Sequence, residues 1–479
     1  MTPTAPAIVD AAPGLEHCFL FEATEASYPV TSIEGEIPRF LRGSYYVNGP
    51  ARFERAGRRY KHWLDGDGMI CSLRFGESGV QFTSRFVETP KLAAERDAGR
   101  FLYRGFGTSF EDDRLRRGLM LEPPVNVSAY RFDGRLLAFS EQSLPYDLDP
   151  VTLETRGVYD FHGKLNEVSP FSAHAKFDTN LMNFGVQFSR DNPTLNVYEF
   201  TPGGELVRRK RHPLRHPYSV HDFAFTPSSY VFFLGPLLMD FGRFVEGVSV
   251  MESLSWEPEK GSEIVVVPRH DKSREVFSVP AGQGYALHGI NAFEDDDRLT
   301  VDILELDEPV YAQYEPIPDL FATVKGCRPA RFVIDKRTRE LTARMTLPYE
   351  HTPDFPSIHP SLAGRAYSHF WMLGISAAGR PGRKFFDELA HGDWSAGAVD
   401  VYRAAPGVYL GGEPVFIPNP DSARDDEGAV IVEEITPESN SAILIFDAAR
   451  VANGPVARLR LQHRVHPGFH SSFHPETIA

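Results

Sequence analysis

Three histidines in the middle of the chain share one kind of setting, where a short apolar stretch meets an acidic residue. They are His174 in "SAHAKFD", His221 in "YSVHDFAFT" and His288 in "LHGINAFEDDD". The C-terminal stretch "HRVHPGFHSSFHPETIA" contains four more histidines. Neutral imidazoles are good ligands for iron, zinc, copper and nickel. These residues therefore predict a metal site built from segments that lie far apart in the sequence.

An all-histidine shell brings no negative charge to a divalent ion. Carboxylates are expected behind the imidazoles, where they accept the second ring N–H and orient and polarise each ring. Most of the 17 histidines in the chain are expected to be surface residues or hydrogen-bonded core residues. The shared setting and order of the three histidines therefore count for more than any one of them.

The segments that carry these histidines belong to a chain rich in predicted strands. Alternating runs such as "MICSLRF", "NLMNFGVQF", "RLTVDILEL" and "AILIFDA" are bounded by turn residues. Helical periodicity is confined to pieces such as "PKLAAERDAGRFL" and "KFFDELAHGDW". No repeat with a signature dipeptide appears, and strands without a linker favour one all-β propeller or large closed barrel. We expect a flexible lead-in over 1–25 and a single domain over 26–479.

The composition limits the partners and the compartment. Hydrophobic residues make up 42% and aromatic residues 12%, with 36 phenylalanines, which suits a flat, apolar ligand. A net charge of −15 argues against nucleic acid as the main partner. Three scattered cysteines form no disulfide framework, and the N-terminus lacks the basic and apolar regions of a signal peptide. These features indicate a cytoplasmic protein.

One apolar stretch, "YVFFLGPLLMDFGRF" at 230–244, has two interpretations. It forms a buried strand followed by a core helix, or it exposes an apolar patch that makes a peripheral contact with a membrane surface. It is too short and too interrupted by glycine, proline and charged residues to span a bilayer.

Four blocks resemble the carotenoid cleavage oxygenase family, and they span nearly the whole chain. The front block "FLRGSYYVNGPARFERAGRRYKHWLDGDGMICSLRF" is similar to the family's opening motifs, and "SAHAKFD", "VHDFAFT" and "HGINAFE" follow in the family's order. The tail "PGFHSS" resembles the family's closing P-x-G-F-H-G. The resemblance implies a seven-bladed β-propeller with a dome of loops and helices over one axial Fe(II) ion per chain.

The same resemblance assigns the ligands. It implies that His174, His221, His288 and His470 hold the iron, and that the other tail histidines, His463, His466 and His474, are bystanders. The family usually has glycine after the last ligand, where this chain has Ser471.

Further positions follow from the family's pattern. Glu141 and Glu413 match two of its three outer-shell glutamates, and Asp354 stands where the third is expected, one methylene shorter. A turn residue after a proline is an equally good interpretation of Asp354. Val125 occupies a place where many members have threonine, so its methyl group is expected to crowd an open metal position. Phe106 is expected to line the substrate or oxygen site.

The implied reaction is cleavage of one conjugated C=C bond of a carotenoid or apocarotenoid by O₂, giving aldehyde or ketone products. Stilbenoid-cleaving members are marked by a lysine before the first glutamate and a tyrosine, which together hold a 4-hydroxyl group. Here Ser140 precedes Glu141 and Phe106 fills the tyrosine place. An apolar polyene is therefore the expected substrate. A stilbenoid or phenylpropanoid dioxygenase is the alternative, and a retinoid isomerase or a binding propeller is a more distant one.

Overall fold

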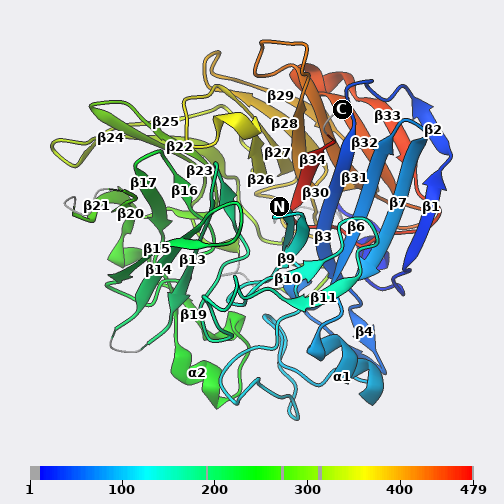
Figure 1. Ribbon diagram of the computed structural model, residues 1–479, viewed down its shortest axis with the longest axis horizontal. Coiled ribbons are helices and arrows are strands. Elements are labelled where there is room, and N and C mark those ends of the chain that lie inside the picture. The colour runs from blue at the N-terminus through cyan, green and yellow to red at the C-terminus, as the bar shows by residue number, and fades with distance from the viewer. Residues whose placement is uncertain (1–10, 190–191, 271–274, 311–314, 477–479) are drawn as a thin grey trace, which may run out of the picture.

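A computed structural model describes residues 11–189, 192–270, 275–310 and 315–476. Seven sheets of four or five strands make up most of the described part, with two short strand pairs beside them. Figure 1 shows the sheets in a ring, with the colour passing around it from blue at the N-terminus to red at the C-terminus. The fold is a seven-bladed β-propeller, which confirms the predicted fold class.

Each blade has an edge strand at the inner end of its sheet, and most neighbouring inner strands contact one another. In order around the ring these are β34 (Ser471–Pro475), β8 (Ser128–Phe132), β12 (Lys176–Phe177), β16 (Ala224–Phe225), β22 (Tyr285–Glu294), β26 (Thr352–Ile358) and β30 (Tyr409–Pro418).

The remaining strands run outward in each sheet and pair antiparallel. They are β3 (Gly43–Ala51), β6 (Asp67–Gly76), β7 (Gly79–Phe86) and β1 (Ala26–Val30) after β34; β9 (Arg135–Phe139), β10 (Tyr146–Leu148) and β11 (Thr155–Val158) after β8; β13 (Leu181–Gln187), β14 (Thr194–Phe200) and β15 (Leu206–Pro213) after β12; β17 (Ser229–Leu234), β20 (Ser262–Pro268) and β21 (Phe277–Gly282) after β16; β23 (Arg298–Leu306), β24 (Arg328–Asp335) and β25 (Glu340–Thr346) after β22; β27 (His369–Ile375), β28 (Glu388–Asp393) and β29 (Ala398–Arg403) after β26; and β31 (Gly428–Ile435), β32 (Ala442–Asp447), β33 (Pro455–Arg460) and β2 (Ser32–Gly35) after β30.

The ring is closed by strands from the two ends of the chain. The C-terminal strand β34 pairs with β3, so one sheet joins the first and last parts of the sequence. In the neighbouring sheet, β2 pairs with β33. Because a propeller blade left open exposes unpaired edges, this double closure stabilises the ring.

Helices are few, as predicted. Helix α1 (Pro90–Ala98) begins at Thr89, whose side chain accepts a hydrogen bond from Leu92 N, and ends at Gly99 in the left-handed conformation. Helix α2 (Phe241–Glu246) is shorter. Both lie at the lower edge of Figure 1, outside the blades. The other helical turns are η1 (Leu15–Cys18), η2 (Trp63–Asp65), η3 (Met251–Ser253), η4 (Pro258–Lys260), η6 (Pro360–Leu362) and η7 (Ala448–Asn453), and the short strand pairs are β4 (Glu54–Arg55) with β5 (Arg58–Arg59) and β18 (Leu237–Met239) with β19 (Leu254–Trp256).

The helix expected in "KFFDELAHGDW" is wrong, because this stretch contains strand β28. β28 lies between β27 and β29 and is buried over nearly its whole length. A strand covered on both faces has no polar face to reveal its two-residue period, so its apolar run is easily mistaken for a helix.

The apolar stretch 230–244 is mostly buried. Strand β17 is covered, and the stretch reaches the surface in α2, where Phe241 is 38% exposed and Val245, just beyond the stretch, is 45% exposed. The strand interpretation is therefore confirmed, but the helix is at the surface rather than in the core. In the described part of the chain, no helix has the length and apolar character needed to cross a membrane.

The flexible lead-in expected over 1–25 needs correction. Residues 1–10 lie outside the described residues, but the segment that follows packs into the core through Ala12, Leu15 and Phe19. The Phe19 ring packs edge-on against Trp63, with centroids 6.2 Å apart. Burying these apolar side chains outweighs the entropy of a free tail.

Candidate metal centre

The structure brings the four predicted ligands together at the axis. His288 lies within β22, and His174, His221 and His470 lie one to three residues before the inner strands β12, β16 and β34. Inner strands of a propeller face one central line, so equivalent positions on different blades meet there.

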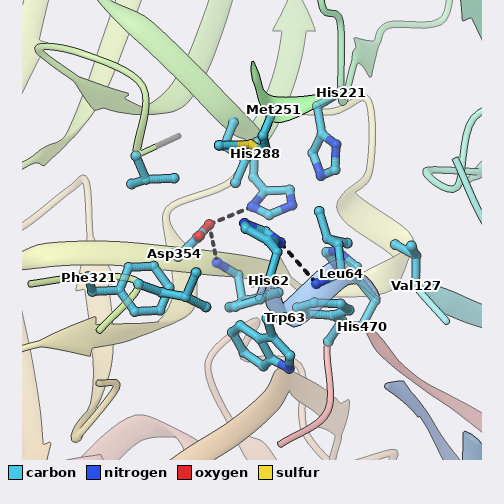
Figure 2. Close-up of a pocket in the computed structure, with 15 residues that line it drawn as sticks. His62, Trp63, Leu64, Val127, His221, Met251, His288, Phe321, Asp354 and His470 are labelled. Atoms are coloured by element: carbon cyan, nitrogen blue, oxygen red, sulfur yellow. Dashed lines mark hydrogen bonds and ion pairs between the residues drawn. The ribbon is translucent and has the colours of Figure 1, made fainter. Parts of the chain in front are cut away.

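The four imidazoles gather around one point. One ring nitrogen of each lies within 4.8 Å of the others, and the Nε2 atoms of His174 and His221 are 2.9 Å apart. In Figure 2, His221, His288 and His470 surround a common space. His174, His288 and His470 are buried, and His221 is partly buried.

These residues fit a metal ion. The Nε2 atom of His288 is buried and has no hydrogen-bonding partner among the described residues. Leaving such an atom unsatisfied costs about 1–3 kcal/mol, unless a ligand takes its lone pair. Burial, reinforced by the neighbouring imidazoles, holds the pKa of His174 and His221 well below its usual value. Both rings are therefore neutral and present lone pairs, as metal ligands must.

Carboxylates lie behind the rings, on the Nδ1 side. A carboxylate oxygen of Asp354 is 2.5 Å from Nδ1 of His288, and one of Glu413 is 3.2 Å from Nδ1 of His470. A Glu141 oxygen is 3.4 Å from Nδ1 of His221. In each of these contacts the carboxylate lies on the Nδ1 side of the ring, so the Nε2 atom remains available at the central point. The three carboxylates predicted to orient the imidazoles are thus all beside them.

Irregularities in the inner strands aim these side chains. The pairing of β22 shifts register across His288, between Ala286 and Gly289, and again after Gly289. β26 shifts between Asp354 and Ser357, and β30 shifts between Gly411 and Val415, around Glu413. A bulge bends its strand and re-aims a side chain, and bulges are common beside active sites. The bulge in β26 lets an aspartate reach a ring that the longer glutamate reaches in the family's usual pattern.

A fourth carboxylate was not predicted. Asp222 directly follows His221, and its Oδ1 atom lies 3.8 Å from Nδ1 of His174 and 2.8 Å from the Lys176 ammonium. Its Oδ2 atom accepts a hydrogen bond from Gly289 N. Every ligand ring therefore has a carboxylate near its Nδ1 atom. Two sequence features could have indicated this fourth carboxylate: the acid in "VHDF" and the lysine two residues after His174.

The carboxylates influence one another's charge. Burial, with a contribution from the Asp222 charge, raises the pKa of Glu141 to about 8. Burial alone would lower the pKa of His288, but the adjacent Asp354 carboxylate raises it above its usual value. The buried Glu141 carboxyl therefore favours its neutral form in the absence of a cation.

The assignment of Val125 to the metal is wrong. Val125 is buried in a separate apolar cluster with Tyr46 and Ile70, whereas Val127 lines the cavity beside the imidazoles. Val125 has a φ of 54°, which is rare for a β-branched residue, and its carbonyl oxygen accepts a hydrogen bond from the Asn48 side chain. Alternation alone would place residues 125 and 127 on the same face of an extended chain, and this conformation of Val125 breaks that relation.

Phe106 lies behind the cavity wall rather than on it. Its ring packs against His62, with centroids 5.2 Å apart, and His62 itself lines the cavity. The Nδ1 atom of His62 accepts a hydrogen bond from Leu64 N, which fixes the ring. His62 was not predicted, although it lies within the front block that resembles the family's opening motifs.

A cavity adjoins the metal centre. Its walls come from the inner strands and from the connecting segments above them (Figure 2). Besides the ligands and Asp354, they are mainly apolar or aromatic: Trp63, Leu64, Val127, Met251, Leu287, Val310, Leu320, Phe321, Phe355 and Phe469, together with His62.

The other tail histidines lie outside the group of four. His466 is 3.1 Å from the Phe19 carbonyl oxygen, His463 is 3.3 Å from the Tyr28 hydroxyl, and His474 lies within β34. Of the tail histidines, only His470 reaches the axis, as the resemblance implied.

Comparison with known proteins identifies the family. The family model described as retinal pigment epithelial membrane protein matches residues 20–475. The chain therefore belongs to this family, the carotenoid oxygenases.

Individual relatives cover nearly the whole chain. An apocarotenoid-15,15'-oxygenase from Synechocystis sp. is 29% identical over 94% of both chains. An isoeugenol monooxygenase from Pseudomonas putida is 29% identical over 93% of this chain and 94% of its own. The crystal structure of the cobalt-substituted Synechocystis apocarotenoid oxygenase matches with a TM-score of 0.87 and 26% identity, over 98% of this chain and all of that one.

Proposed function

We propose that the protein is a dioxygenase that cleaves a conjugated C=C bond of a carotenoid or apocarotenoid. One O₂ is consumed for each bond cut, one oxygen atom enters each fragment, and both products are carbonyl compounds. The observation that carries this proposal is the apolar cavity directly beside four clustered imidazoles. The family membership and the apocarotenoid oxygenase relative support it.

We infer that the ion is iron, held by His174, His221, His288 and His470, one per chain. Bound ferrous iron supplies the redox chemistry that makes O₂ reactive toward a conjugated double bond. The protein's part is to orient the four rings, through Asp354, Glu413, Glu141 and Asp222. No general base is needed, because the reaction moves no proton.

The cavity wall selects and positions the substrate. Trp63, Phe321, Phe355 and Phe469 offer flat apolar surfaces that suit a polyene. None of the residues that line the cavity in the described part is a lysine, arginine or tyrosine. A phenolate in this cavity would leave a charged oxygen poorly matched, at a cost of about 1–3 kcal/mol or more. A polyene incurs no such cost.

A phenylpropanoid substrate is the second candidate, because the isoeugenol monooxygenase relative is as similar as the apocarotenoid oxygenase. In addition, His62 gives the cavity one polar side chain.

The test is a parallel assay of the iron-loaded protein with a long apocarotenal, a 4-hydroxystilbene and isoeugenol. We expect loss of polyene absorbance, two carbonyl products by mass spectrometry and one O₂ consumed per cleavage. Efficient cleavage of a phenolic substrate with the apocarotenal untouched would replace the proposal by the second candidate. Metal-dependent binding of the apocarotenal without turnover would indicate a binding protein.

We also infer a peripheral membrane contact at α2. Phe241 and Val245 are exposed there, and α2 packs against η3, whose Met251 lines the cavity. An apolar surface close to the cavity would receive a lipid-dissolved substrate. Liposome co-sedimentation tests this inference: Phe241→Ser with Val245→Ser should reduce binding, and unchanged binding would exclude α2 as the contact.

A further inference from the structure

A second group of potential metal ligands lies between two blades, away from the axial site. His369 begins β27 in one blade, and Asp425 and Asp426 lie in the connection between β30 and β31 of the next. One ligand atom from each of the three residues lies within 4.8 Å of the others. His369 is partly buried and Asp426 is buried, whereas the Asp425 side chain is 41% exposed, so solvent reaches the group on the Asp425 side.

A second histidine orients His369. The Nδ1 atom of His369 lies 3.1 Å from Nε2 of His391 on the neighbouring strand β28. His391 Nε2 is therefore placed to accept the Nδ1–H of His369. This arrangement leaves the Nε2 lone pair of His369 on the side of Asp425. A metal-binding histidine commonly donates its other N–H in this way.

The His391 ring is itself held firmly. It stacks on Trp371 at 5.1 Å, with 10° between the planes, and Trp371 stacks on Phe416 of the next blade at 4.2 Å, with 3° between the planes. The stacked rings of His391, Trp371 and Phe416 therefore connect the two blades. Because His391 is fixed in this stack, it also fixes the position of the His369 ring and its Nε2 atom.

The distance between His369 and Asp425 suits a shared ion. Nε2 of His369 is 3.7 Å from Oδ1 of Asp425, which is too long for a hydrogen bond. Ligand bonds of about 2.0–2.2 Å in a tetrahedral site place two ligand atoms roughly 3.4 Å apart. A small inward movement of the side chains would therefore bring both onto one ion.

The charge at this place is negative. Asp393 pairs with His369 in the strand ladder, and Asp425, Asp426 and Glu427 follow one another in the loop. Asp426 accepts two hydrogen bonds from Arg424, at 2.9 and 2.6 Å. The Arg424 side chain is 66% exposed, so it can turn into solvent when a divalent ion takes its place.

We propose that His369, Asp425 and Asp426 bind one divalent transition-metal ion of the zinc type, with solvent as the remaining ligand. One imidazole with two carboxylates is a donor set that suits zinc better than the all-oxygen shells of calcium or magnesium. The bound ion links the β30–β31 connection of one blade to β27 of the neighbouring blade. Its role is to fix that junction, and it is independent of the proposed oxygenase reaction.

The test is zinc binding by the full-length, iron-loaded protein, measured as metal content after dialysis and as affinity by titration. Wild type should retain one zinc in addition to the axial metal. His369→Gln and Asp425→Asn should each lose it, or bind it at least tenfold more weakly. Asp421→Asn is the matched control, because Asp421 lies exposed in the same loop outside the group. Circular dichroism verifies that each variant is folded.

A second measurement separates this site from the axial one. His470→Ala should lose axial metal but keep the zinc that depends on His369, and zinc should raise the melting temperature of wild type but not of His369→Gln. Calcium should give no such rise. The proposal is overturned if wild type binds no second zinc, or if His369→Gln binds it as tightly as wild type does.

Discussion

A carboxylate oxygen of Asp354 lies 2.5 Å from Nδ1 of His288, although aspartate is one methylene shorter than the glutamate of the family's usual pattern. The same oxygen accepts a hydrogen bond from the Phe355 N–H at 2.8 Å. Phe355 has a φ of 53°, at the bulge of β26. The backbone therefore moves the carboxylate to the ring, and the side chain does not need the extra length.

This relationship predicts a graded response. Asp354→Ala removes the acceptor and should lower metal affinity or activity roughly 10- to 100-fold. Asp354→Asn keeps an amide oxygen that can accept the ring N–H, so its loss should be smaller. Metal titration and thermal melting of both variants check the order. Equal losses in the two variants would show that charge matters rather than hydrogen bonding.

Substitution of Asp222 should affect metal binding partly through Lys176, because Asp222 lies 3.8 Å from His174 and forms an ion pair with Lys176. Asp222→Asn should weaken metal binding and leave the Lys176 ammonium uncompensated near two neutral imidazoles. Asp222→Asn combined with Lys176→Met should recover part of the affinity. Equilibrium dialysis of the metal gives the readout, and a double variant weaker than the single one would refute this account.

The histidines of the tail give the sharpest control. His470→Ala should abolish activity and lower bound metal, because it removes one of four ligand atoms. His474→Ala changes a residue of the same strand region, at the edge of β34, and should leave both unchanged. Metal analysis by mass spectrometry compares the two. Metal loss in His474→Ala with retention in His470→Ala would reverse the assignment.

Val127 is predicted to control the size of the cavity near the ligands. Its carbonyl oxygen accepts a hydrogen bond from His470 N at 3.1 Å, so its side chain is fixed close to the centre. Val127→Phe should fill the cavity and lower substrate turnover at least tenfold while the metal content stays unchanged. Turnover equal to that of wild type would place the substrate elsewhere.

Acid should destabilise the protein through buried histidines. Burial lowers the pKa of His466 to about 3, whereas the unfolded chain binds the same proton near pH 6.5. Between these values the unfolded state binds more protons, so the free energy of unfolding falls as pH falls, by up to about 1.4 kcal/mol per pH unit for one proton. The loss ends below pH 3, where the native ring also becomes protonated.

The variant His466→Gln isolates this contribution from that of the carboxylates. Urea unfolding at pH 7, 6, 5 and 4 should show a smaller decrease in stability for the variant than for wild type, whatever their difference at pH 7. Parallel curves for the two proteins would contradict the assignment.

The all-β character and three of the four histidines leave local signals, because the strands show alternating apolar residues bounded by turns and His174, His221 and His288 share one kind of setting. The seven blades and the choice of His470 depended on the resemblance to the family's motifs. Asp222 was missed because an acid after a histidine is equally typical of a turn. Val125 was chosen over Val127 because the two are related by the strand period, which the positive φ of Val125 breaks. Strand β28 and the packing of Leu15 and Phe19 depend on neighbours distant in sequence.

The closing strand β34 has a consequence for how the protein is made. His470 immediately precedes β34, so the residue that completes the group of four arrives with the strand that completes the ring. A nascent chain on the ribosome holds only three of the imidazoles and an open first blade. Assembly of the full ligand set is thereby deferred until His470 and β34 have been made, and a chain that stops before them lacks both its last ligand and its closure.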